Sequence, residues 1–212
     1  MKNKKVWFVT GCSKGLGHAL VNELLEQGYM VSATSRSTQA LVEAFGNESE
    51  RFLPLSVNLA DEESVKTALK KTVLKFGRVD VVVNNAGYTH LATIEEMSDK
   101  AVRELFDINV FGLLNVIRAA LPIMRKQNSG HIFNVSSLGA YNVGPLSGPY
   151  CATKHAVKAL SETLAMEVKQ FGIHVTDVKP GFMRTEFFGV SHKTDIAEQS
   201  PYQDLYNENM DF

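Results

Sequence analysis

The sequence predicts a single α/β domain built on a doubly wound parallel sheet. Short runs rich in β-branched residues alternate with longer segments of helical periodicity, which is the order of repeated strand–helix–strand units. Two of these runs, Val6–Val9 and Val79–Val83, are nearly continuously apolar, as expected for parallel strands covered on both faces. Because no internal repeat or Pro/Gly/Ser-rich linker interrupts the pattern, we expect residues 1–212 to form one domain.

Strands and helices are expected to alternate along the chain. The strand candidates are Val6–Thr10, Met30–Thr34, Phe52–Val57, Val79–Asn84, His131–Ser136 and His174–Lys179. The helix candidates between them are Leu16–Gln27, Thr38–Phe45, Glu62–Phe76, Asp99–Arg125 (as one helix or two) and Tyr150–Phe171. After Pro180-Gly181 the periodicity weakens, so residues 182–212 are predicted to be either a mobile segment packed over a site or a poorly ordered tail.

Composition and charge exclude several functional classes. A net charge of −1 and a pI near 6.6 leave no electrostatic footprint for nucleic acid or an anionic membrane. The basic start is followed by an apolar run of only a strand's length, unlike a signal peptide, and no segment approaches the ~20 apolar residues of a membrane-spanning helix. A cytoplasmic location is therefore expected. Cys12 and Cys151 cannot build a disulfide framework and lack metal-ligand spacing to a histidine, so no metal site is expected.

A glycine-rich turn follows the first predicted strand and opens the first helix. Residues 10–17 read Thr-Gly-Cys-Ser-Lys-Gly-Leu-Gly. Such glycines let the backbone bend sharply and approach a pyrophosphate, and the start of the helix offers unpaired N–H donors. The glycines could instead only permit a tight turn, but at the first strand-to-helix junction of a parallel sheet we favour cofactor binding. The candidate cofactor contacts in this turn are Gly11, Ser13, Lys14, Gly15, Leu16 and Gly17.

The end of the second strand discriminates between nicotinamide cofactors. An NAD site usually has an acid about 20 residues beyond the glycines, where it binds the ribose 2′-hydroxyl. This chain has Thr34-Ser35-Arg36 there and no acid until Glu43. A 2′-phosphate requires cations and hydroxyl donors, which Ser35, Arg36 and Lys14 can supply. The two bases could also be solvated surface residues, but their presence together with the missing acid favours NADP(H).

Tyr150 and Lys154 are the candidate catalytic pair. Their i, i+4 spacing at the start of a predicted helix places the phenol and the ammonium on one helical face. Free tyrosine is a poor base at neutral pH, but a lysine at ~4 Å favours phenolate by up to about 4 kcal/mol at an effective dielectric constant of 20. We therefore expect a lowered tyrosine pKa, suited to acid–base work on a carbonyl–alcohol pair. The spacing alone is common by chance.

Polar residues expected at the same sheet edge support this pair. Asn134–Ser137 ends one predicted strand, where a serine hydroxyl can bond to a substrate oxygen. Asn84–Gly87 ends the preceding strand and suits either a turn beside the cofactor or a turn alone. Asn109 lies in an otherwise apolar helical run and is either a satisfied core amide or a member of a proton relay.

Together these motifs resemble the short-chain dehydrogenase/reductase family over nearly the whole chain and in the family's order. The residues that carry the resemblance are Thr10-Gly11-x-x-x-Gly15-x-Gly17, Asn84–Gly87, Asn109, Ser137, Tyr150-x-x-x-Lys154 and Pro180-Gly181. The resemblance implies a Rossmann-type fold and, because the chain stops at Phe212, the absence of the family's last strand. It also implies that bases at the positions of Lys14 and Arg36 mark a member that uses NADP(H).

The resemblance further implies a role for each site residue. Tyr150 would protonate the nascent alkoxide during reduction, or act as the base during oxidation, while Lys154 lowers its pKa and binds the nicotinamide ribose. Ser137, thirteen residues before the tyrosine, would polarise the substrate carbonyl, and Asn109 would hold a water that links Lys154 to solvent. Other cofactor contacts are implied at Asn58 (where the family often has an aspartate facing the adenine), Leu59, Asn85, Ala86, Gly87, Pro180, Gly181 and, for the carboxamide, Thr185.

The leading hypothesis is an NADP(H)-dependent carbonyl reductase or alcohol dehydrogenase acting on a small molecule. Seven apolar or aromatic residues could line the site, which would favour an apolar substrate, or could equally be packing for elements absent from the chain. They are Leu138, Tyr141, Val143, Leu146, Phe182, Phe187 and Phe188. One alternative is a truncated dinucleotide-binding protein without turnover, as a redox sensor or a remnant. Another is an isomerase, epimerase or dehydratase built on the same site. The early chain end weakens the expectation of a homo-oligomer.

Overall fold

The computed structural model describes residues 4–181, 192–194 and 200–209, and it confirms the doubly wound parallel sheet. Six parallel strands lie in the order β3-β2-β1-β4-β6-β7. Their bounds are Val6–Val9 (β1), Met30–Ser35 (β2), Phe52–Ser56 (β3), Val81–Asn84 (β4), Gly130–Val135 (β6) and Ile173–Val178 (β7). The chain order reverses between β1 and β4, which is where open α/β sheets bind ligands, at the carboxyl ends of the strands.

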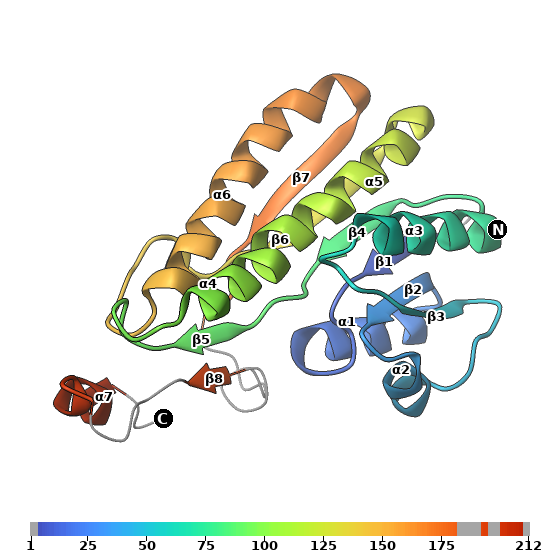
Figure 1. Ribbon diagram of the computed structural model, residues 1–212. Helices are drawn as coiled ribbons and strands as arrows, with labels where there is room; N and C mark the ends of the chain where they lie inside the picture. The colour runs from blue at the N-terminus through green and yellow to red at the C-terminus, as the bar shows by residue number, and fades with distance from the viewer. Residues whose placement is uncertain (1–3, 182–191, 195–199, 210–212) are drawn as a thin grey trace.

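Helices cover both faces of the sheet (Figure 1). The buried clusters place two helices on one face, α1 (Gly15–Glu26) and α2 (Thr38–Phe45). The other face carries α3 (Glu62–Phe76), α5 (Leu113–Gln127) and α6 (Gly148–Val168). Each helix connects consecutive parallel strands, so the loops that leave the strands gather at the carboxyl edge of the sheet.

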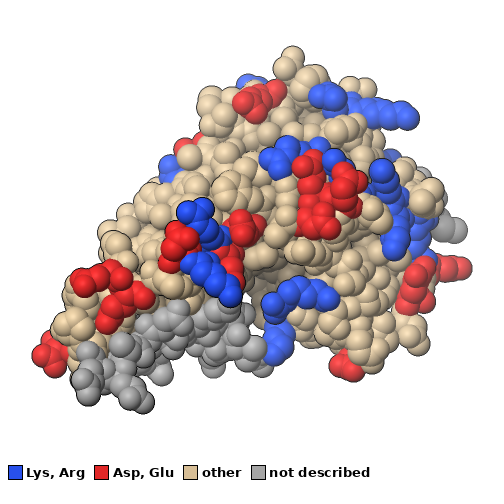
Figure 2. Space-filling model, viewed as in Figure 1, with Lys and Arg blue, Asp and Glu red and all other residues tan. Residues whose placement is uncertain are grey.

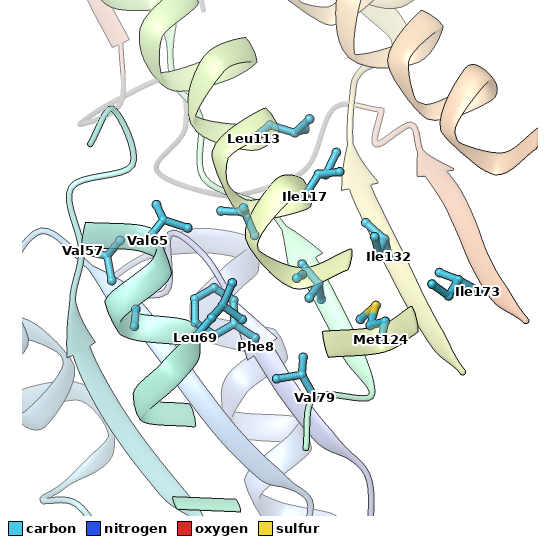
Figure 3. Packing of buried hydrophobic residues seen from close by; sticks show 14 of the residues in the cluster. Phe8, Val57, Val65, Leu69, Val79, Leu113, Ile117, Met124, Ile132 and Ile173 are labelled. Carbon is cyan, nitrogen blue, oxygen red and sulfur yellow. The ribbon is translucent and has the colours of Figure 1, made fainter. Parts of the chain in front are cut away.

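The larger apolar cluster joins the sheet to α3, α5 and α6 (Figure 3). Phe8 and Ile132 of the sheet are buried in it together with Leu69 of α3 and Ile117 and Met124 of α5. Burying one such side chain contributes about 1.5–3 kcal/mol. This packing fixes the three helices over the sheet and thereby fixes the loops that surround the site.

Capping residues explain why several helix boundaries agree closely with the sequence prediction. Ser37, Asp61 and Ser98 each accept a hydrogen bond from a backbone N–H in the first turn of α2, α3 and α4 (Asp99–Phe106), respectively. Such a bond satisfies one of the donors that a helix start leaves unpaired. Gly77, in the left-handed region with a φ of 79°, ends α3.

The predicted segment Asp99–Arg125 divides into more parts than expected. A π-helical turn, η1 (Asp107–Gly112), separates α4 from α5. An 18-residue window within Asp99–Gln127 is also more apolar than the sequence prediction allowed, since its mean hydropathy of 1.4 and the length of the helix would by themselves suit a membrane span. The core helix of a soluble protein meets the same criteria, and Val116 and Ala120 of α5 belong to the cluster against the sheet.

Several short elements were not predicted. They are β5 (Thr89–Leu91), η2 (Leu138–Ala140), β8 (His192–Thr194) and α7 (Gln203–Asn209). The predicted helix Tyr150–Phe171 ends in a 3-10 turn, η3 (Lys169–Phe171). β5 and β8 pair in parallel as a separate two-stranded sheet. Within the stretch predicted to be a mobile segment or a tail, the structure thus describes a strand and a helix, and residues 182–191, 195–199 and 210–212 lie outside the described part.

Candidate active site

The glycine-rich turn after β1 is held against the loop after β4. The hydroxyl of Thr10 accepts hydrogen bonds from the backbone N–H groups of Asn85 (3.1 Å) and Ala86 (3.0 Å). The side-chain amide of Asn85 donates in return to the carbonyls of Thr10 and Gly11, both at 3.0 Å. Gly11 has a φ of 70°, and a Cβ on it would lie 2.7 Å from the Cα of Ala86. The position therefore requires glycine.

The first turn of α1 opens onto the same region without a capping side chain. Lys14 is the N-cap residue, and its side chain makes no capping hydrogen bond. A Cβ on Gly17 would clash with the carbonyl oxygen of Gly11, so the helix start and the turn pack closely against each other. Backbone N–H groups at such a helix start are donors for an anion.

A cavity of about 1010 Å³ lies along the carboxyl edge of the sheet. It lies at the upper end of the roughly 300–1,000 Å³ typical of ligand sites. Its lining brings together most of the predicted site residues: Gly11, Ser13, Lys14, Gly15, Leu16, Ser35, Arg36, Asn58, Leu59, Asn85, Ala86, Gly87, Ser137, Tyr150, Lys154, Pro180 and Gly181. Gly17 and Asn109 are not in the lining, and Thr185 lies outside the described residues.

The end of β2 contributes basic and hydroxyl groups to this cavity. Ser35 and Arg36 line it together with Lys14, whereas the acids in the lining, Glu104 and Asp107, come from α4 and η1. No acid follows β2 directly, as the sequence indicated. On the face shown in Figure 2, basic and acidic side chains are interspersed rather than gathered into areas of one sign.

Tyr150 lies in the first turn of α6 and lines the cavity. Burial raises the pKa of its phenol, a hydrogen bond with Ser137 offsets part of the rise, and Cys151 adds to it. The net direction is opposite to the sequence prediction, in which Lys154 lowers this pKa. The i, i+4 spacing showed that the two side chains share a face, but it could not show that the phenol is removed from water.

Lys154 lies one turn further along α6 and is buried. Its Nζ donates to the backbone carbonyl of Val135 at 2.9 Å and lies 5.7 Å from the centroid of the Tyr150 ring. Burial lowers the pKa of Lys154 to about 8, and the negative charge of Asp177 on β7 opposes this effect. The ammonium therefore predominates at pH 7 and is lost as the pH rises through 8.

Asn109 lies in the π turn η1, buried between the loop after β4 and α6. Its Oδ1 accepts from the backbone N–H of Tyr88 (3.1 Å), and its Nδ2 donates to the carbonyl of Tyr88 (3.0 Å) and to the hydroxyl of Thr153 (3.2 Å). The amide is thus satisfied by protein groups, as in the first of the two interpretations of this residue. The proton-relay role stays a prediction.

The apolar wall differs from the predicted one. Leu138 and Leu146 line the cavity, but Tyr141 and Val143 are exposed and do not. The ring of Tyr141 instead lies within 5.2 Å of Lys158 Nζ and 5.4 Å of Lys179 Nζ. The three predicted phenylalanines, Phe182, Phe187 and Phe188, lie outside the described residues.

Other residues at the site were missed in the sequence. Leu91 of β5 and Asn209 of α7 line the cavity, and Tyr206 of α7 is buried in a cluster with Leu91 and Leu146. A three-residue strand and a seven-residue helix are too short for periodicity to reveal. Thr10 was named in the glycine-rich motif, but its hydrogen bonds to the loop after β4 were not predicted.

The sheet order, the glycine-rich turn and the cavity at the carboxyl edge define a Rossmann-type nucleotide-binding protein. The short chain dehydrogenase family matches residues 5–195 of the sequence. The chain belongs to this family and is therefore an oxidoreductase of the short-chain dehydrogenase/reductase type.

Individual relatives differ in how far the match extends. The chain is 41% identical over 202 residues to Oxidoreductase BOA17 from Botryotinia fuckeliana. This match covers 94% of the chain and 73% of the relative. Matches to three uncharacterized oxidoreductases of Schizosaccharomyces pombe span only 58% to 61% of those proteins. The chain thus covers part of its relatives' length.

Two similar solved structures contain nicotinamide cofactors. ElxO with NADP bound has a TM-score of 0.81 at 34% identity, covering 86% of this chain and 75% of that one. The 3-ketoacyl-(acyl-carrier-protein) reductase from Brucella melitensis, complexed with NADH, has a TM-score of 0.83 at 26% identity, covering 86% and 78%. Structural neighbours therefore include proteins bound to each of the two dinucleotides.

Proposed function

We propose that this chain is an NADP(H)-dependent reductase that interconverts a carbonyl and an alcohol, with Tyr150 as the general acid/base. The observation that carries the proposal is the grouping of Ser137, Tyr150 and Lys154 in the lining of one cavity that also contains the glycine-rich turn. Ser137 lies after β6 as the N-cap of η2, Tyr150 lies in the first turn of α6, and Lys154 lies buried one turn later.

The residues of the cavity fit a dinucleotide. Gly11 and Gly17 let the turn after β1 pack tightly against Ala86 and the start of α1, and this start supplies N–H donors beside the cavity. We expect residues 11–17 to hold the pyrophosphate, Asn85–Gly87 to flank the ribose on the nicotinamide side, and Lys154 to bind that ribose. When bound, the nicotinamide would exchange a hydride with the substrate carbon.

The preference for NADP(H) rests on two basic side chains at the end of the cavity where we expect the adenosine. Lys14 and Arg36 line the cavity with the hydroxyl-bearing Ser35, and no acid follows β2 to bind a free 2′-hydroxyl. Guanidinium and ammonium groups form charge-assisted hydrogen bonds with phosphate, about twice as strong as neutral ones. An acid after β2 would repel a 2′-phosphate, so its absence and the two bases act in the same direction.

The proton chemistry follows from the two altered pKa values. Because burial raises the pKa of Tyr150, its phenol keeps a proton at neutral pH and can donate it as an alkoxide develops. Ser137 bonds to the phenol and would also bond to the substrate oxygen, orienting both groups. Lys154 is cationic below pH 8 and stabilises the phenolate left after transfer. These directions favour reduction at neutral pH.

The substrate end of the cavity favours a small, uncharged and largely apolar carbonyl compound. Leu91, Leu138 and Leu146 line it, and the nearby polar groups of Asn142 and Asn209 are neutral amides. Amides can fix the orientation of a polar substituent, whereas they give no charge pairing for a carboxylate or phosphate on the substrate. We retain a cytoplasmic location as a prediction.

The test is replacement of Tyr150 by Phe, with turnover and cofactor binding measured separately. NADPH oxidation is followed against ketones, aldehydes, quinones and steroids, and NADPH affinity is taken from its fluorescence. We expect Tyr150→Phe to lose about 10²–10⁴-fold in kcat, the usual contribution of general acid–base catalysis, while NADPH binding stays unchanged. Tyr141→Phe is the matched control, because that ring lies outside the cavity lining.

Two outcomes would contradict the proposal. Full activity of Tyr150→Phe would remove the tyrosine from the mechanism. Tight NADPH binding by the unaltered chain with no turnover of any carbonyl compound would support instead a dinucleotide-binding protein that does not catalyse the reaction.

A further inference from the structure

Asp177 is a buried carboxylate that the proposed mechanism does not use. It lies on β7, its side chain is only 8% exposed, and it is not part of the cavity lining. Among the described residues its oxygens accept no hydrogen bond of normal geometry, although Lys179 Nζ approaches Oδ2 to 2.7 Å as an ion pair. Lys179 pairs with Oδ2 only, so the buried Oδ1 keeps no hydrogen-bond partner among the described residues, and a second positive group nearby would lower the cost of burying the charge.

The strand register shows which way Asp177 faces. Its Cα partner on β6 is Asn134, and paired residues on neighbouring strands point to the same face of the sheet. Asn134 donates from Nδ2 to the hydroxyl of Ser161 on α6 at 2.9 Å, so this is the face that α6 covers. Asp177 therefore lies beneath α6, on the same side of the sheet as Lys154.

The side chain of Lys154 extends from α6 to the same end of β6 and β7. Its Nζ donates to the carbonyl of Val135, the residue directly after Asn134, and Val135 is paired with Val178, directly after Asp177. The carbonyl gives the ammonium a neutral acceptor but no opposite charge. Asp177 supplies that charge from the neighbouring strand, and it is the charged group whose influence on Lys154 opposes the effect of burial.

We propose that Asp177 is a positioning residue for the reaction: its buried carboxylate keeps Lys154 cationic and seated on the carbonyl of Val135. This role rests on the proposed function, because it assigns Asp177 to the lysine of that site. Asp177 touches neither the cavity nor the phenol and acts only through Lys154. Lys179, which is 30% exposed, neutralises part of the carboxylate and so limits its effect.

The elements packed against α6 around Lys154 carry other titratable groups. They are His90 on β5, Asp99, Lys100, Arg103 and Glu104 on α4, Asp107 on η1, His131 on β6, Tyr141 after η2, Tyr150, Cys151, His155, Lys158, Glu162 and Glu167 on α6, His174 on β7 and Lys179 directly after β7. Lys158 is paired with Glu162 at 2.8 Å, and Lys179 with Asp177 itself. The ion pair Asp177–Lys179 therefore offers two substitutions whose electrostatic effects on Lys154 have opposite signs.

The experiment measures the titration of Lys154 directly, in the protein without cofactor. Lysines are labelled with ¹³C at Cε, the Lys154 signal is assigned with Lys154→Arg, and its shift is followed with pH. Asp177→Asn removes the negative charge and is expected to lower the pKa of Lys154 by about one pH unit, the lower end of the effect of a nearby opposite charge. Lys179→Met removes a like charge and is expected to raise it. Asp99→Asn, an exposed member of an ion pair on α4, is expected to change nothing.

The outcomes separate this proposal from the proposed function. In the pH profile of NADPH-dependent turnover, the loss of activity at alkaline pH should begin at a lower pH in Asp177→Asn and at a higher pH in Lys179→Met. Turnover at pH values below this loss should change little. If the unaltered chain shows no turnover, the proposed function fails, but the lysine titration still decides whether Asp177 controls Lys154. An unchanged pKa of Lys154 in both variants, or a shift of both in one direction, overturns the role of Asp177. If Asp177→Asn does not fold, the shift in Lys179→Met decides alone.

Discussion

The two ends of the cavity are built in different ways. At the β1–β2 end, the backbone itself makes the surface: Gly11 and Gly17 remove side chains where two segments meet, and Thr10 and Asn85 tie those segments together. At the end formed by β6, β7 and α6, the surface depends on ionisable side chains removed from water. The first end is defined by shape and the second by charge.

This difference decides how each end responds to substitution. A clash between backbones cannot relax, so a change at the first end should affect binding and stability together. A buried charge can gain or lose a proton, so a change at the second end should appear first in the pH dependence and only then in stability. The following predictions test that contrast, from the largest expected effect to the smallest.

Gly11→Ala should have the largest effect. The added Cβ would lie 2.7 Å from the Cα of Ala86, at a φ of 70°. We expect loss of NADPH affinity by more than about 100-fold and destabilisation by about 2–3 kcal/mol from clash and strain combined. Gly77→Ala is the matched control, because its φ is 79° but nothing lies within 4 Å of the added atom. It should cost about 1 kcal/mol in chemical denaturation and leave affinity unchanged. Equal effects of the two substitutions would contradict a binding surface shaped by close backbone contact.

Arg36→Ala should change cofactor selection without affecting the fold. Removing one charge-assisted contact to a 2′-phosphate is expected to weaken NADPH binding about 10-fold or more, since such bonds contribute about 1.5–3 kcal/mol. NADH affinity should stay the same, because NADH has no phosphate at that position. Fluorescence titration with both cofactors measures the ratio, and Arg103→Ala, in an exposed ion pair on α4, serves as the control. An equal loss of affinity for NADPH and NADH would show that Arg36 does not bind the 2′-phosphate.

Tyr206→Phe should have the smallest effect, at the substrate end. The hydroxyl of Tyr206 accepts from the backbone N–H of Thr93 (3.1 Å) and donates to Glu96 (2.7 Å) in a buried setting. Its loss leaves the Thr93 donor unpaired, so we expect about 1–2 kcal/mol of destabilisation and faster amide exchange at Thr93. Tyr202→Phe removes an exposed hydroxyl that bonds to Glu95 and should be nearly neutral. If both variants have unchanged melting temperatures, α7 is not held by this contact.

The sequence predicted the shape-defined end far better than the charge-defined end. Gly11 and Gly17 can be recognised in the sequence, because the close packing of neighbouring elements allows only glycine at these positions. The spacing of Tyr150 and Lys154 likewise predicted their common helical face. It could not predict the rise in the pKa of Tyr150, which depends on packing around α6. Nor could any local pattern link Asp177 to Lys154, because their proximity depends on the pairing of β6 with β7.

The same argument explains which elements were found. Strands β1 and β4 are buried on both faces and were visible as apolar runs, and α3 was visible from its helical periodicity, while its caps Asp61 and Gly77 were identified only in the structure. β5 and α7 gain their stability from distant contacts, such as that of Tyr206 with Glu96, and their own sequences are too short to show a period.

The π turn η1 has a consequence for how this chain can change length. Each residue advances an α-helix by about 100°, and a π turn holds one residue more than an α turn. The turn at Asp107–Gly112 therefore resets the angular phase between α4 and α5. Deleting a single residue there would restore a regular helix but rotate the apolar side of α5 away from the sheet, or Asn109 away from Tyr88 and Thr153. This short segment should thus tolerate substitutions more readily than deletions, although it lies inside a continuous helical rod.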